Sequence, residues 1–166
     1  MQPYSSKICF TGKRPQSMPW GSNEKDPRCV ALKAQLEQAV EQAVLDGYSY
    51  FITGMALGVD MWAGEAVLRL KGRYPNLFLE AAIPCPNQPK QWMPHEQQRY
   101  YQLLFCCDKK TMCSRSCSRA SYLARNRYMV DAAQKVIAVY DGSGGGTGYT
   151  IRYARSKGRD VQVISF

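Results

Sequence analysis

Short apolar runs alternate with segments of helical period along almost the whole chain of 166 residues. This alternation is typical of a parallel sheet that is covered by helices on both faces. It predicts strands at 7–10, 48–52, 77–83, 110–113, 136–140 and 161–164, and helices at 28–46, 59–70, 92–105, 120–133 and 149–156. The sequence therefore predicts an α/β fold in which residues 1–166 form a single domain with five or six mostly parallel strands.

The composition is that of an ordinary globular protein, with 45% hydrophobic and 21% charged residues,. No apolar run approaches the roughly 20 residues that a transmembrane helix needs. The first ten residues lack the order of basic, apolar and small residues that marks a secretory signal,. We therefore expect a cytoplasmic protein without a membrane partner.

Seven cysteines are scattered through the chain. An odd number at irregular spacing favours reduced thiols over a disulfide framework. A zinc site formed by Cys113, Cys117 and His95 is the alternative, but no Cys-x-x-Cys pair supports it,. We therefore predict free thiols, no metal site and no cofactor.

The net charge of +9 favours anionic partners, because a positive surface potential attracts phosphates,. A nucleotide needs only a few well-placed donors, whereas nucleic acid gains from many backbone contacts, and the composition does not separate these partners. A basic surface that is simply solvated is a third interpretation.

The sharpest local signal is a glycine-rich loop between the strand at 136–140 and the last helix. Glycines let the backbone approach a ligand closely, and the helix that follows offers free amides and a positive dipole end to an anion. A flexible turn is the alternative. The loop ends in neither Gly-Lys-Ser/Thr nor a dinucleotide fingerprint, so ATP hydrolysis and hydride transfer lose support. The predicted ligand-binding residues here are Asp141, Gly144, Gly145, Gly146 and Thr147.

A second turn follows the first strand, where Thr11 and Gly12 precede the basic pair Lys13 and Arg14. Gly12 can turn the chain, and Arg14 offers a planar, permanently charged donor to a phosphate. The alternative is a surface loop with solvated cations. We predict that Thr11, Gly12 and Arg14 contact the ligand.

A third turn begins at Thr53 and Gly54 and ends at Gly58, just before a helix whose first turn contains Asp60. The Asp60 carboxylate either complements the helix dipole or accepts hydrogen bonds from ribose hydroxyls. We include all four residues in the predicted site.

Arg125 and Asn126 lie in the helix at 120–133, and Asn126 falls on its apolar stripe. A polar group in such a place requires a partner. Asn126 either ties adjacent loops together or, with Arg125, faces the ligand, and we favour the ligand.

Five segments, in this order, resemble the SLOG superfamily and most closely its YpsA-like branch. They are Phe10-Thr11-Gly12-Lys13-Arg14-Pro15, Thr53-Gly54-Met55-Ala56-Leu57-Gly58-Val59-Asp60, Ala82-Ile83-Pro84, Arg125-Asn126-Arg127 and Asp141-Gly142-Ser143-Gly144-Gly145-Gly146-Thr147. The superfamily also contains the LOG phosphoribohydrolases and the DNA-processing Smf proteins. The resemblance implies a Rossmann-like fold and a pocket for nucleotide-derived molecules at the carboxyl edge of the sheet, and it adds Pro84 to the predicted site.

The resemblance does not imply one activity. LOG enzymes carry a Pro-Gly-Gly-x-Gly-Thr-x-x-Glu motif whose glutamate helps to break the N-glycosidic bond. Alignment on Gly146 and Thr147 places Thr150 at that position, and a threonine cannot exchange a proton near neutral pH as a tuned glutamate can,. No other catalytic set is recognisable, so we predict no catalytic residues.

The leading hypothesis is a signalling module that senses or sequesters a nucleotide-derived small molecule, such as ADP-ribose, NAD or a cyclic ADP-ribose-like signal. One alternative is a hydrolase of nucleotide N-glycosidic or phosphate bonds. The other is a single-stranded DNA-binding protein, for which the net charge and the tyrosines available for stacking argue,. By analogy with related Rossmann-like proteins, we also expect a homo-oligomer.

Overall fold

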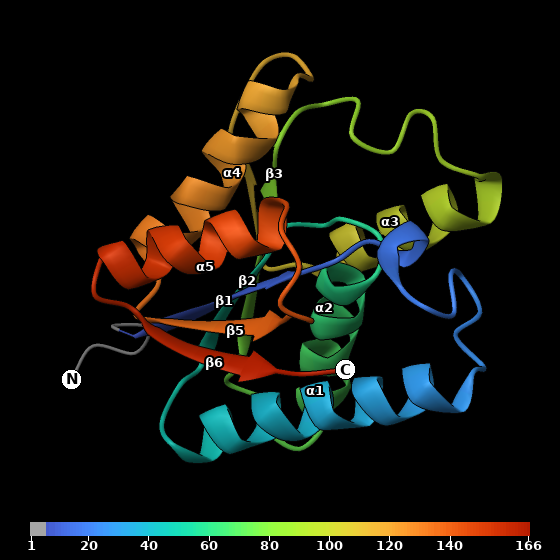
Figure 1. Cartoon of the computed structure of the whole chain (residues 1–166). Helices are drawn as coiled ribbons and strands as arrows, with labels where there is room; N and C mark the ends of the chain where they lie inside the picture. Colours follow the sequence, from blue (N-terminus) through green and yellow to red (C-terminus); the bar gives the residue numbers. More distant parts are fainter. Residues whose placement is uncertain (1–5) are drawn as a thin grey trace.

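The computed structural model describes residues 6–166 and contains one parallel sheet with helices on both of its faces (Figure 1). Residues 1–5, which belong to the amino-terminal segment without the pattern of a secretory signal, lie outside the described residues. The elements in chain order are β1 (Lys7–Gly12), η1 (Pro15–Ser17), α1 (Pro27–Leu45), β2 (Tyr50–Thr53), α2 (Val59–Leu70), β3 (Phe78–Ile83), α3 (Pro94–Cys106), β4 (Lys109–Met112), α4 (Arg119–Ala132), β5 (Lys135–Val139), α5 (Gly146–Ser156) and β6 (Asp160–Ile164).

Within residues 6–166 the sheet has six strands in the order β4-β3-β2-β1-β5-β6, and every neighbouring pair is parallel. The predicted α/β, Rossmann-like fold is confirmed. The order reverses between β1 and β5, where Cys9 pairs with Val136 and Gly12 with Val139. In open α/β sheets such a switch point opens a crevice at the carboxyl ends of the two strands, and ligands bind there.

The two faces of the sheet bury separate cores. One core packs the sheet against α1 and α2 and includes Phe10, Leu36 and Trp62, and the other packs it against α4 and α5 and includes Met129 and Ala154. Figure 1 shows α1 below the sheet and α5 above it. The helices therefore shield both faces of the sheet from solvent and leave its carboxyl edge accessible for a site.

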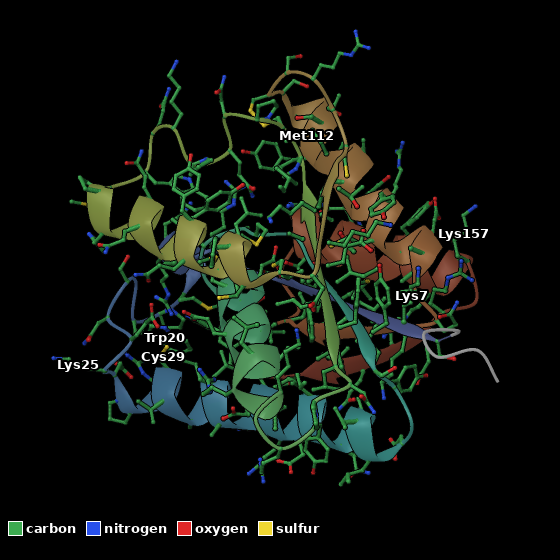
Figure 2. All side chains as sticks on the ribbon, turned by 180° about the vertical axis from the view of Figure 1, so that it is seen from behind. Lys7, Trp20, Lys25, Cys29, Met112 and Lys157 are labelled. Atoms are coloured by element: carbon green, nitrogen blue, oxygen red, sulfur yellow. A yellow bond between two sulfur atoms is a disulfide. The ribbon has the colours of Figure 1, made fainter. Side chains whose placement is uncertain are left out.

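The carboxyl edge lies opposite the edge at which the strands begin. In Figure 2 Met112, at the end of β4, is near the top, whereas Lys7, at the start of β1, lies lower and at the right. The same view shows Trp20 beside Cys29, where the loop before α1 packs into the core.

Helix α5 differs most from its predicted boundaries, because it begins at Gly146 and not at 149. Glycine and threonine are weak helix formers, so the sequence pattern hides its first turn. Burial of Thr147, Thr150 and Ile151 against the sheet stabilises that turn. The consequence is that the amide groups at the start of α5 directly follow the glycine loop.

The prediction that the thiols are reduced is wrong for two of them. Cys85, which follows β3, forms a disulfide with Cys117, and their Cα atoms are 5.1 Å apart. The two residues are 32 positions apart in sequence, and the fold brings them together because β3 and β4 are neighbours. The free cysteines include buried Cys9 and Cys107, and burial raises the pKa of the Cys107 thiol to about 12.

Within residues 6–166, no helix is long and apolar enough to cross a membrane. In the same part of the chain, no group of three or more histidine, cysteine, aspartate or glutamate residues is suited to hold a metal ion.

Candidate functional site

A cavity of about 310 Å³ opens where β1 and β5 end, and we call it the β1–β5 pocket. Figure 1 shows β1 running into η1, and β5 into the loop before α5, at the same end of the sheet. The fold thus brings together four segments that are far apart in the sequence, namely 10–17, Asp60, 126–129 and 144–147. The lining residues are Phe10, Thr11, Gly12, Lys13, Arg14, Gln16, Ser17, Asp60, Asn126, Met129, Gly144, Gly145, Gly146 and Thr147.

The glycine loop, residues 141–146, is fastened to the end of β1 by one carboxylate. Asp141 forms an ion pair with Lys13 at 2.9 Å and accepts hydrogen bonds from the amide and the hydroxyl of Ser143 at 2.9 and 2.7 Å. The Lys13 ammonium also donates to the Ser143 hydroxyl. The hydrogen bonds from Ser143, followed by that from Lys13, hold the pKa of Asp141 well below its usual range.

The glycines of this loop face empty space. A Cβ atom placed on Gly144, Gly145 or Gly146 would meet no heavy atom within 4 Å beyond the adjoining chain. Gly145 has a φ of +105°, which side chains rarely adopt, whereas Gly144 has an ordinary backbone conformation. The backbone at Gly144 therefore does not require a glycine, but the absence of a side chain there leaves room in the pocket.

Arg14 is the lining cation that is most accessible to a ligand. Its side chain is exposed, lines the pocket and lies over the ring of Tyr122 with 5.2 Å between the guanidinium carbon and the ring centroid. Within residues 6–166 it forms no ion pair with a carboxylate under 4.0 Å. A guanidinium stacked on an aromatic ring keeps its edge free for a bidentate contact with a phosphate.

Asp60 lies in the first turn of α2 and brings a carboxylate to the pocket floor, where 6% of the residue is exposed. It accepts a hydrogen bond from the amide of Ala56 at 3.3 Å. Burial raises the pKa of Asp60, and the charges of Arg125 and Arg14 oppose that rise. A buried arginine stays protonated, so the neighbouring Arg125 guanidinium favours ionised Asp60.

Arg125 itself does not line the pocket. It is 4% exposed, donates to the carbonyl of Gly54 and to the side chain of Asn126, and lies behind Asp60. The Gly54 carbonyl also accepts a hydrogen bond from Gln88 at 3.2 Å. Arg125 therefore supports the floor of the pocket and orients Asn126, which does line it.

Three glycines of the predicted site allow the segments around them to pack closely. A Cβ on Gly12 would lie 2.4 Å from Val59, and one on Gly54 would lie 2.6 Å from Asp60. Gly58 has a φ of +88°, and its Cβ would lie 2.9 Å from the carbonyl oxygen of Lys13. These glycines allow the start of α2 to press against the end of β1.

The structure thus places the predicted site residues in two groups. The group that lines the pocket is Thr11, Gly12, Arg14, Asp60, Asn126, Gly144, Gly145, Gly146 and Thr147. The group that does not line it is Thr53, Gly54, Gly58, Pro84, Arg125 and Asp141. In the second group, Thr53 donates to the carbonyl of Asp60 at 2.7 Å and Pro84 is buried beyond β3. Asp141 borders the pocket through its bond to Lys13.

Sequence reasoning missed several lining residues. Gln16 and Ser17 belong to the short helical turn η1, which the prediction treated as an undifferentiated loop over 11–26. Proline at the first position of that turn is the signal that could have identified it,. Phe10 and Met129 are core residues whose edges reach the pocket, and no local pattern marks them.

Thr150, which the sequence resemblance aligns with the glutamate of LOG enzymes, is buried. It is 1% exposed, and its hydroxyl donates to the carbonyl of Gly146 at 2.9 Å. The hydroxyl therefore satisfies the backbone of its own helix and does not face the pocket.

Comparison with known proteins places this geometry in a family. The YpsA family model, described as the YspA SLOG family, matches residues 8–164. The SPbeta prophage-derived protein YoqJ of Bacillus subtilis strain 168 is 31% identical over 144 residues, which are 79% of this chain and 84% of the relative. The sequence resemblance to the YpsA-like branch is thereby confirmed.

Solved structures agree with the fold. DNA processing protein A (DprA) of Helicobacter pylori, studied for its single-stranded DNA binding mode, superposes on this chain with a TM-score of 0.64 at 18% identity. The DprA of Streptococcus pneumoniae superposes with a TM-score of 0.63 at 17% identity. Each match covers 95% of this chain, but the chain spans 64% and 50% of those proteins. At this identity the likeness shows the fold alone. From the family model and the related sequence together, the chain belongs to the YpsA family of the SLOG proteins.

Proposed function

We propose that the protein binds a nucleotide-derived small molecule, with a phosphate in the β1–β5 pocket. The observation that carries this proposal is the empty space in front of Gly144 and Gly146 at the start of α5. The first amides of a helix have no acceptor within the helix and attract anions. Glycines without neighbours at that point leave room for a phosphate to reach those amides.

The other lining residues are suited to the rest of a nucleotide. The Asp60 carboxylate can accept hydrogen bonds from ribose hydroxyls, and the Asn126 amide can bond to a base,. Arg14 supplies a charged donor at the rim. The cavity volume of about 310 Å³ lies at the lower end of the usual range for small-molecule sites,.

Calorimetry with ADP-ribose, NAD, cyclic ADP-ribose and mononucleotides tests the proposal. We expect saturable binding of at least one of them, and Arg14→Gln should weaken it about tenfold or more because a charge-assisted hydrogen bond is lost. Arg73→Gln is a matched control, since Arg73 also lies over a tyrosine but is far from the pocket, near the end of α2. Folded protein that binds none of these molecules would refute the proposal.

We further propose that the ligand is held and not turned over. The support is that the Thr150 hydroxyl bonds to the backbone of its own helix, and that the charge of nearby Arg125 opposes the rise that burial causes in the pKa of Asp60. Chromatography of ligand after long incubation with stoichiometric protein should return it intact. Release of free base or ribose phosphate would instead establish the hydrolase that the LOG relationship suggests.

Single-stranded DNA is a second candidate ligand because of a row of cations and rings on α4 and α5. Arg127 donates to the hydroxyl of Tyr149, the ring of Tyr149 is parallel to that of Tyr153, and Lys157 lies over Tyr153. Such rows suit stacked bases and phosphates. If this row binds DNA, the affinity for oligonucleotides must fall steeply with salt, because counterions are released from the strand.

Three expectations from the sequence stay predictions. They are the cytoplasmic location, the organisation of residues 1–166 as a single domain and the homo-oligomer. Sedimentation equilibrium tests the oligomer, since a monomer at every concentration would contradict it.

A further inference from the structure

The charged groups around the β1–β5 pocket largely neutralise one another, and this constrains the charge of the ligand. Lys13, Arg14 and Arg125 are the cations near the pocket, and Asp60 and Asp141 are the anions. A site that binds phosphate by charge alone would need an excess of free cations. The pairing of these five groups therefore decides how much negative charge the site can accept.

The first pair lies beneath the pocket. Asp60 and Arg125 are 6% and 4% exposed, and both approach Gly54, where an added Cβ would lie 2.6 Å from the carboxylate and 2.8 Å from the guanidinium. Burial of an unpaired charge is costly, so each group stabilises the ionised form of the other. Arg125 is consequently committed to Asp60 and adds no net charge for a ligand.

The second pair lies at the rim. The Lys13 ammonium contacts Asp141 at 2.9 Å, and Asp141 also accepts two hydrogen bonds from Ser143. The Asp141 carboxylate thus occupies the Lys13 ammonium and the Ser143 donors, which a phosphate could otherwise use. Arg14 has no carboxylate within 4.0 Å in residues 6–166. Asp60 and Arg125 also form no ion pair that short, but their charges interact at longer range, so that three cations and two anions leave one net positive charge beside the pocket.

We propose that the pocket selects a phosphate esterified on two sides, which carries a single negative charge, over a terminal phosphate. This inference rests on the proposed binding of a nucleotide at this site. One free guanidinium and the neutral amides of α5 match one negative charge. A terminal phosphate carries about −1.5 to −2 at pH 7, and Asp60 and Asp141 repel the additional charge.

A matched pair of ligands tests the selection directly. Adenosine 5′-monophosphate and its methyl ester differ by one methyl group and by the second negative charge of the phosphate. In calorimetry at neutral pH we expect the methyl ester to bind at least about fivefold more tightly, because the second charge would lie near two carboxylates. Tighter binding of the monophosphate overturns the inference and leaves the proposed function intact, whereas binding of neither ligand, by a folded protein, overturns the proposed function.

Variants of the rim pair test the cause of the selection. Asp141→Asn frees Lys13, so we expect the preference for the methyl ester to fall by about threefold or more, whereas Lys13→Gln leaves Asp141 unpaired and should increase it. Asp46→Asn is the control, because it changes the net charge equally at the end of α1, on the opposite edge of the sheet. Two folded variants with the wild-type preference would overturn the inference.

A last comparison distinguishes a small ligand from a nucleic-acid strand, whose phosphates are also diesters. The inference commits to the small ligand, since the cavity measures only about 310 Å³ and is lined by residues of η1, α2 and the start of α5. An oligothymidylate should therefore bind no more tightly, per molecule, than the methyl ester. A strand that binds more tightly and loses affinity steeply with salt would contradict the choice of a small ligand.

Discussion

Two glycine turns at the carboxyl edge have a similar composition and opposite surroundings. In the turn at 53–58, a Cβ on Gly54 or Gly58 would lie within 3 Å of other atoms. In the loop at 141–146, a Cβ on Gly142 or Gly144 would meet nothing within 4 Å. We call the first the closed turn and the second the open loop.

The comparison shows that glycine has two different roles beside the same pocket. In the closed turn it allows side chains to pack, so that Asp60 and Arg125 can approach the backbone. In the open loop it leaves unoccupied volume beside the amides of α5. A substitution in the closed turn should therefore affect folding, and one in the open loop should affect binding.

The largest expected effect is that of Gly54→Ala. The new methyl group would overlap the Asp60 carboxylate and the Arg125 guanidinium, and separation of this buried pair should lower the free energy of unfolding by about 4 kcal/mol,. Urea unfolding measures the change, with Gly144→Ala as the control. A loss below about 1 kcal/mol would show that the closed turn is not tightly packed.

Loss of the disulfide should have the next largest effect on stability, because the disulfide holds a segment that packs against the closed turn. Cys85 begins the segment that carries Gln88, whose amide donates to the Gly54 carbonyl. Cys117→Ser opens a loop closed across 32 residues and should lower the free energy of unfolding by about 3 kcal/mol,. Wild-type protein in reductant should unfold at the same urea concentration as this variant, and Cys106→Ser, at an exposed free thiol, should not change it.

Gly144→Ala tests the open loop. Its methyl group would enter empty space without backbone strain, so stability should stay within about 0.5 kcal/mol of wild type or rise slightly,. If a phosphate fills that space, the affinity for the ligand should fall by about tenfold or more, because the methyl group blocks access to the amides of α5. Calorimetry measures the affinity. Undiminished binding would mean that the ligand lies elsewhere.

The sequence predicted the fold, and the edge of the sheet at which the β1–β5 pocket lies, because both follow from local patterns. Apolar runs and helical stripes identified every strand and α-helix, and parallel strands require their carboxyl ends to share one edge,. Glycines after β1, β2 and β5 therefore indicated the end of the molecule at which the pocket lies. The roles of individual residues were less predictable, since Gly54 and Gly144 look alike in sequence and differ only in their neighbours.

The errors arise from contacts between distant segments. The disulfide between Cys85 and Cys117 depends on two loops meeting above β3 and β4, and sequence spacing does not report that distance,. Arg125 was predicted to contact the ligand, but its helix turns it under the pocket toward Gly54. A charged residue beside a pocket can thus either line it or support its floor, and only the fold distinguishes these two roles.

The smallest expected effect comes from an ion-pair cluster beside the closed turn, since Glu24 and Arg99 line a second cavity together with Gly58. Glu24, in the loop before α1, accepts hydrogen bonds from Arg99 of α3 and Lys33 of α1. Partial burial alone would raise the pKa of Glu24, but these hydrogen bonds outweigh it and lower the pKa below 4.5. Stabilisation by Glu24 is therefore complete above its unfolded pKa and is lost as the pH falls through the lower, folded pKa.

Glu24→Gln should accordingly lower the free energy of unfolding by about 1 kcal/mol at pH 7, a figure reduced for solvent screening. The difference from wild type should shrink as the pH falls below about 4.5, because protonation then removes the same ion pairs from the wild-type protein. Urea unfolding over this pH range measures it, with Glu37→Gln, which removes an exposed pair to Arg69, as the control. A difference that stays constant with pH would assign the loss to packing, and a change in ligand affinity would connect this region to the open loop.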